Sequence, residues 1–153
     1  MLSRWHNKRL GFLPRRRWLS VAAVAFGGCS SFAPTEADLP VGAVPMVAPA
    51  AYAEWFSRTQ ACSGLEGQIQ QIQWFVVPDA NVFETPAGPK VGMWEKTGGV
   101  ARIIIAGNYA GHEMVVRHEM LHQLLDREGH PAEYFIERCK LTWETWPTHL
   151  AGL

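Results

Sequence analysis

Apolar residues with helical spacing occur in three stretches after residue 48. The pattern at 49–65 predicts a helix that ends near Ser63-Gly64, and the pattern at 112–128 predicts a second helix without internal Pro or Gly. A shorter helix is predicted at 131–139, because Gly129 interrupts the preceding helix and Pro131 favours a first helical turn. Helices are therefore expected before and after the region between residues 65 and 112.

Three stretches in that intervening region have the pattern of β-strands. Residues 71–77 place Ile72 and Trp74 at alternating positions before Pro78 stops the run. Two further strands, at 91–95 and 100–106, are separated by a turn with two glycines, which predicts a hairpin. Helix, antiparallel strands, helix and closing helix together predict a small α+β domain with a short antiparallel sheet.

The first 29 residues have the pattern of an export signal. Six basic residues precede an apolar run of about nine residues, far short of the roughly twenty that span a bilayer. Gly27-Gly28-Cys29 resembles a bacterial lipobox, which implies lipidation of Cys29; ordinary cleavage is the alternative. Arg15-Arg16-Arg17 also resembles a twin-arginine signal, although a plain basic leader explains the same residues. We therefore expect an exported protein, anchored by lipid to a membrane of the cell envelope.

Composition separates a linker from a folded unit in the rest of the chain. Residues 30–48 carry three prolines and no apolar periodicity, which predicts a flexible tether to a domain at 49–153; a disordered segment with no spacing role is the alternative. All fourteen acidic residues but only eight of the fourteen basic ones follow the export signal, so that part has a net charge of about −6. This balance disfavours a nucleic-acid-binding surface. We expect the domain to be a monomer.

The helix predicted at 112–128 carries one H-E-x-x-H motif. His118 and His122 are four residues apart, so their rings project from one face of a helix and can reach the same metal ion. Glu119 lies beside that ion, where it can take a proton from an activated water. The alternative is a core or solvated helix that carries two histidines by chance.

A catalytic zinc site normally has a third protein ligand and leaves one position for water. His130 lies in a Gly-His-Pro sequence, and the helix break there can fold it back toward His122. Glu133 and Glu137 are competing carboxylate ligands, because spacing alone does not fix the loop geometry. Asp126 follows His122 by one turn and is either an orienting partner of a ligand imidazole or a solvated acid.

The segment from His118 to His122, followed by His130-Pro-x-x-Tyr-Phe135, resembles the zincin metalloproteases. The nearest resemblance is to their small minigluzincin and SprT-like branches. It implies a minimal zincin domain that binds zinc through the three histidines and uses Glu119 as general base and acid. It also implies that the strand nearest the cleft binds an extended substrate through main-chain hydrogen bonds, a role for 91–95 or 100–106.

Cysteine usage fits an oxidising compartment. If Cys29 is lipidated, Cys62 and Cys139 remain as a pair, which predicts a disulfide between the first helix and the last. Closing a loop of about 77 residues would stabilise the fold by roughly 4 kcal/mol on the chain-entropy argument. Two buried thiols are the alternative.

The motif and the export signal together predict a zinc-dependent peptidase of the bacterial cell envelope. The alternative is a non-catalytic zinc-binding or structural lipoprotein with the same fold. Glu119 favours the enzyme, because a closed structural zinc site uses a fourth ligand and has no need of an acid beside its first histidine.

Overall fold

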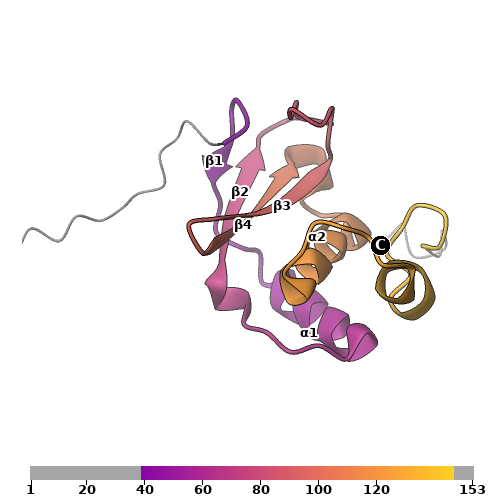
Figure 1. The fold of residues 1–153 in the computed structure, drawn as a ribbon. Coiled ribbons are helices and arrows are strands. Elements are labelled where there is room, and N and C mark those ends of the chain that lie inside the picture. Colours follow the sequence, from indigo (N-terminus) through magenta and orange to yellow (C-terminus); the bar gives the residue numbers. More distant parts are fainter. Residues whose placement is uncertain (1–38, 147–153) are drawn as a thin grey trace, which may run out of the picture. The chain divides into compact units, whose positions relative to one another are not determined.

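A computed structural model describes residues 39–146 of the chain (Figure 1). The export signal with Cys29, the first part of the expected tether and residues 147–153 lie outside the described residues. In chain order the elements are β1 (Val44–Pro45), α1 (Ala51–Ser63), η2 (Ile69–Gln71), β2 (Ile72–Val77), β3 (Gly92–Thr97), β4 (Val100–Ala106), η3 (Gly107–Tyr109), α2 (Glu113–Leu125) and η4 (Glu133–Arg138). Among the described residues, no helix is long and apolar enough to cross a membrane.

The four strands form one sheet in the order β1, β2, β4, β3 (Figure 1). β3 and β4 pair antiparallel, as the hairpin predicts, and β1 pairs antiparallel with β2. β2 and β4 run parallel, with Ile72 opposite Ala101 and Val77 opposite Ala106. The α+β fold is therefore confirmed, but the expected antiparallel sheet is mixed. The chain after β2 passes to the far edge, forms β3 there and then turns back into the centre as β4.

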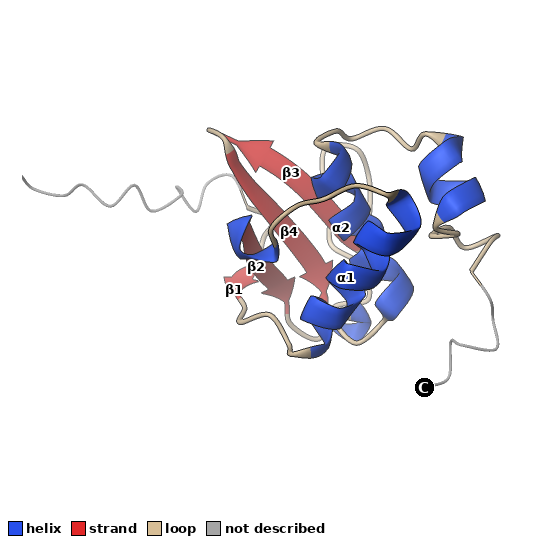
Figure 2. Ribbon diagram, turned by 90° about the horizontal axis from the view of Figure 1, so that it is seen from below, coloured by secondary structure: helices blue, strands red, loops and turns tan. Residues whose placement is uncertain are grey.

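β4 is buried on both faces because each face packs against a hydrophobic core. Ile103 and Ile105 pack in the main core with residues of α1 and α2, while Ile104 and Ala106 pack in a smaller core with Phe83. Figure 2 shows both helices on the same face of the sheet. The continuous apolar run in β4 is typical of a strand that is covered on both sides.

Residues 39–48 belong to the folded unit, although the sequence pattern places them in the tether. β1 pairs with Val76 and Phe75 of β2, and Leu39 and Ala43 pack against the smaller core. A strand of two residues that includes a proline has no periodicity, so the sequence pattern does not locate this end of the tether.

α1 is fastened to the end of the domain by a disulfide. The helix ends at Ser63 and has Gly64 in the left-handed region, φ 72°, as its C-cap, which confirms the expected end. Cys62 in its last turn is joined to Cys139, the residue after η4, as the cysteine count predicts. Arg138 adds a hydrogen bond of 2.9 Å from its guanidinium to the Ser63 carbonyl. The closing segment is thus tied to α1 at two adjacent residues.

The motif helix α2 ends earlier than the sequence predicts. Its last residue is Leu125, and Asp126 adopts the left-handed conformation, φ 50°, where the prediction continued to Glu128. Asp tolerates this conformation better than most residues, so it can end a helix where glycine is absent. The closing helix η4 is present but π-helical, with the Cys139 N–H donating to the Tyr134 carbonyl at 3.0 Å.

Candidate metal centre

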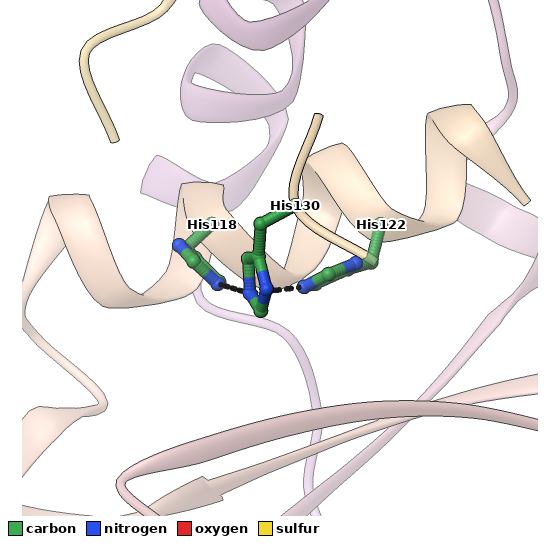
Figure 3. A group of neighbouring side chains, drawn as sticks. All are labelled: His118, His122 and His130. Carbon is green, nitrogen blue, oxygen red and sulfur yellow. Dashed lines mark hydrogen bonds between the residues drawn. The ribbon is translucent and has the colours of Figure 1, made fainter. Parts of the chain in front are cut away.

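The side chains of His118, His122 and His130 converge on one point (Figure 3). Nε2 of His130 lies 2.9 Å from Nε2 of His118 and 3.2 Å from Nε2 of His122. His118 and His122 come from one face of α2, and the end of that helix at Asp126 lets the chain return with His130. The structure thus brings together the three histidines that the sequence singles out.

The carboxylates that compete for a place in this cluster lie elsewhere. Glu133 pairs with Arg138 at 2.7 Å, and Glu137 is exposed on η4. Asp126 pairs with Lys96 at 2.7 Å and is not a partner of a ligand imidazole. Within residues 39–146, the group placed to hold a metal ion consists of the three histidines.

Backbone carbonyls orient the two histidines of α2. Nδ1 of His118 donates to the Leu141 carbonyl at 2.7 Å, and Nδ1 of His122 donates to the Arg127 carbonyl at 2.8 Å. Because a carbonyl can only accept, both Nδ1 atoms carry the proton and both Nε2 atoms keep a lone pair. Those lone pairs point toward His130, which is the arrangement that metal ligation requires.

Phe135 of η4 lies against all three imidazoles. Its side chain is fully buried, and its ring centroid is 4.7 Å from that of His118 and 4.8 Å from those of His122 and His130. Close packing on this side limits rotation of the rings and excludes water from them. Phe135 therefore covers one side of the three-histidine cluster.

Loss of hydration favours the uncharged form of the three histidines, although His130 itself is exposed. Burial lowers the pKa of His118 and of His122 to about 4, against the opposing effect of their hydrogen bonds to carbonyls. Burial also lowers the pKa of His130. Neutral imidazoles are metal ligands, whereas three imidazolium rings would repel one another and a cation.

The Glu119 carboxylate is buried where α2 meets β3, with 6 % of the residue exposed. Burial raises its pKa to about 8, although a hydrogen bond from the Trp94 backbone and the charge of Lys90 oppose the shift. Gly92 lies directly against it, because a Cβ at this position would be 2.8 Å from Oε1 of Glu119. A carboxyl group with this pKa can both accept and donate a proton near neutral pH.

β3 borders the centre, and its outer edge is unpaired in the described sheet. The Ala106 N–H donates to the Val91 carbonyl at 2.9 Å, so the main-chain groups of Val91 face β4. Successive residues of a strand direct these groups to opposite edges, so those of Gly92 and Trp94 face the outer edge. The Trp94 ring also stacks beside His122, with centroids 6.2 Å apart. The Trp94 N–H donates to the Glu119 carboxylate, so β3 presents the other outward main-chain groups of this edge and the Trp94 ring as an aromatic wall.

The centre opens into a cleft of about 580 Å³. Its walls come from β3, from α2, from the turn at 85–89 and from residues 141–144. Trp143 lines it and is 56 % exposed, so its ring is available to a bound molecule. A cleft of this volume is in the range that proteins use for small ligands or short peptide segments.

Sequence reasoning missed the parts of the centre that lie outside the motif. The carbonyls of Arg127 and Leu141 have no signature in a sequence, since every residue has a carbonyl. Gly92 did leave a signal, because a glycine inside an expected strand often marks a close approach of another group to the backbone. Nothing in the sequence marks Lys90 as a residue of the cleft.

No protein-family model matches the chain, and neither a curated protein nor a solved structure shows a significant similarity to it. The chemistry of the site therefore has to follow from its own residues. Zinc fits this donor set, because nitrogen ligands at about 2.0 Å in a tetrahedral arrangement lie about 3.3 Å apart. The Nε2 separations of 2.9 and 3.2 Å from His130 are close to that value, and the ligand atoms of all three histidines lie within 4.8 Å of one another.

Proposed function

We propose that this protein is a zinc-dependent peptidase of the bacterial cell envelope. The observation that carries the proposal is the convergence of three neutral imidazoles beside a buried carboxylate, in a cleft that borders a free strand edge. His118, His122 and His130 would hold the ion. When bound, zinc would supply Lewis acidity to water and to a peptide carbonyl.

Glu119 performs the proton transfers in this proposal. Its carboxylate takes a proton from the water that attacks the peptide carbonyl carbon. It then gives this proton to the leaving amine as the C–N bond breaks. Burial raises the pKa of this carboxyl above its usual range, which favours a group that has to act first as a base and then as an acid.

β3 is the strand that would hold the substrate. β4 has neighbours on both sides within the sheet, whereas β3 has a free edge and lines the cleft. An extended peptide can add to such an edge through main-chain hydrogen bonds. This arrangement favours the stretch 91–95 over 100–106 for substrate binding.

A closed structural zinc site accounts for fewer of these features. Among the described residues, no fourth Cys, His or carboxylate joins the three histidines, and Cys62 and Cys139 are engaged in their disulfide. Burial of Glu119 disfavours its charged form, as the raised pKa indicates. A structural site gains nothing from that cost, whereas a peptidase needs the proton carrier.

We also propose that the protein is exported and anchored through a lipid on Cys29. The disulfide supports an oxidising compartment. Metabolic labelling with a fatty-acid analogue should mark the wild type and leave Cys29→Ser unmarked. An unlabelled protein found outside the membrane fraction would instead indicate an ordinary cleaved signal.

The peptidase proposal is tested by zinc content measured beside turnover of a mixed peptide library. His118→Ala and His122→Ala should lose nearly all zinc and all hydrolysis, and His130→Ala should bind zinc clearly more weakly. A wild type that binds zinc tightly but cleaves nothing would favour the non-catalytic alternative. Full zinc in His130→Ala, with loss in Glu133→Ala, would show that the third ligand is misassigned.

A further inference from the structure

The cleft contains one ammonium group and several carboxylates. Of the lysines and arginines in the described part of the chain, Lys90 is the one that lines it. The carboxylates that line it are those of Glu95, Glu119, Glu128 and Glu144. Other cations nearby are engaged, since Lys96 pairs with Asp126 at 2.7 Å and Arg102 with Glu95 at 3.3 Å. The Lys90 ammonium has no hydrogen bond or ion pair with a described residue, so it is available to a bound molecule.

The main chain holds the base of this side chain in place. The Lys90 N–H donates to the Phe83 carbonyl and the Phe83 N–H donates to the Lys90 carbonyl, both at 2.9 Å. Thr85 and Gly88 close the turn between them with reciprocal hydrogen bonds of 3.2 and 2.9 Å. The ammonium is therefore carried on a flexible stem from a fixed point just before β3.

The charge of Lys90 acts on the whole centre. It contributes, less strongly than burial, to the lowered pKa of all three histidines, and it opposes the raised pKa of Glu119. Lys90 lines the same cleft as the three histidines and Glu119, so its ammonium shares this space with any group bound next to the histidines.

We propose that Lys90 binds a carboxylate of the substrate, either the C-terminus of a peptide or the side chain of an acidic residue. The inference rests on the proposed peptidase function, because it assigns the substrate class of the same site. A carboxylate placed elsewhere in the cleft would meet Glu128 or Glu144, and repulsion there reinforces binding at Lys90. The preferred substrates are therefore peptides with a carboxylate near the bond that is cleaved.

Equilibrium binding tests this assignment separately from catalysis. The full chain carrying Glu119→Gln is loaded with zinc and titrated calorimetrically with two peptide pairs. One pair is tetra-alanine with a free or an amidated C-terminus, and the other is amidated Ala-Ala-Glu-Ala or Ala-Ala-Gln-Ala. We expect the carboxylate member of at least one pair to bind about tenfold more tightly. The pair that shows the preference identifies the source of the carboxylate.

Three substitutions in the same background locate the effect. Lys90→Met should abolish the preference and leave the affinity for the uncharged peptides unchanged. Lys96→Met is the matched control, because it removes an ammonium from β3 that does not line the cleft, and it should keep the preference. Lys90→Arg retains the positive charge and should retain most of the preference.

The assignment is overturned if the two members of each pair bind equally or do not bind. It is also overturned if Lys90→Met weakens charged and uncharged peptides by the same factor, which would indicate a general effect of its charge. Turnover of the same peptides by the wild-type protein is measured in parallel. A carboxylate preference that depends on Lys90 without any hydrolysis would refute the peptidase proposal and leave the binding assignment standing.

Discussion

The cleft has two principal walls, α2 and β3, and they contribute to it in different ways. α2 supplies titratable side chains at helical spacing, namely His118, Glu119 and His122. β3 supplies main-chain groups along a free edge and, at Gly92, the absence of a side chain. The contribution of α2 depends on which residue types occupy the helix. The contribution of β3 depends on the path of its backbone.

The two walls also depend on each other. Glu119 belongs to α2, but its carboxylate lies against Gly92 and accepts a hydrogen bond from the Trp94 backbone. His122 belongs to α2, and the Trp94 ring stacks beside it. The Glu119 carboxylate is thus positioned by a neighbouring strand as well as by its own helix. This dependence can be tested by changing one wall at a time.

The largest effect is expected from a change in the helical wall. Glu119→Gln keeps the size of the side chain but removes the base, so peptide hydrolysis should fall by about a thousandfold or more. Zinc content should remain close to that of the wild type, because the three histidines are untouched. Turnover and metal content are measured on the same preparation. Hydrolysis at the wild-type rate would refute the role of Glu119.

A smaller loss is expected from a change in the strand wall. In Gly92→Ala the new Cβ would be 2.8 Å from Oε1 and 3.0 Å from Cγ of Glu119, so the carboxylate has to move. A displacement of this kind can lower kcat by about a hundredfold. Zinc content and folding should be preserved, because the group that yields is the end of a flexible side chain.

Gly111→Ala is the matched control for the strand wall. A Cβ at Gly111 meets nothing within 4 Å, so activity should stay at the wild-type level. Steady-state kinetics on one peptide would compare the two variants, with the loss in Gly92→Ala expected in kcat more than in KM. Equal activity of Gly92→Ala and wild type would show that close contact with β3 does not position Glu119.

The difference between the walls also explains what the sequence could predict. The spacing of His118 and His122 implies a shared face once a helix is assumed, and the cysteine count leaves Cys62 and Cys139 as a pair. The parallel pairing of β2 with β4 depends on the path of residues 78–91, which no periodicity describes. The sequence leaves the choice between His130 and a glutamate open, because only the left-handed turn at Asp126 decides where the chain returns.

The stability of the metal-free protein should depend on pH in two opposite ways. Glu119 has a pKa of about 8 in the folded protein and 4.5 as its ordinary value, so the unfolded chain loses this proton first and stability falls as pH rises through that window. His118 and His122 have a folded pKa of about 4 against 6.5, so the unfolded chain gains protons first and stability falls as pH drops from 6.5 to 4.

Glu119→Gln separates these two contributions. Without the carboxyl group, the decline toward pH 8 should shrink while the decline below pH 6.5 should remain. Urea unfolding in the presence of a chelator, at several values between pH 4 and pH 8, measures both. If the variant and the wild type show the same decline from pH 5 to pH 8, burial of Glu119 is not its cause.

The smallest effect concerns the contact that joins the two walls directly. The indole N–H of Trp94 donates to Oε1 of Gln123 at 2.8 Å, next to His122 on α2. Trp94→Phe keeps an aromatic ring but loses this hydrogen bond, which should lower the free energy of unfolding by about 1 kcal/mol, with a further loss from the smaller ring. Gln123→Met removes the other partner, and the double variant completes a thermodynamic cycle.

A coupling energy of about 1 kcal/mol would assign the loss to the hydrogen bond, because packing of the smaller ring is then cancelled in the cycle. A coupling near zero would mean that this hydrogen bond does not hold α2 and β3 together, and that the hydrophobic core, the Glu119 contact and the Lys96–Asp126 ion pair do so instead.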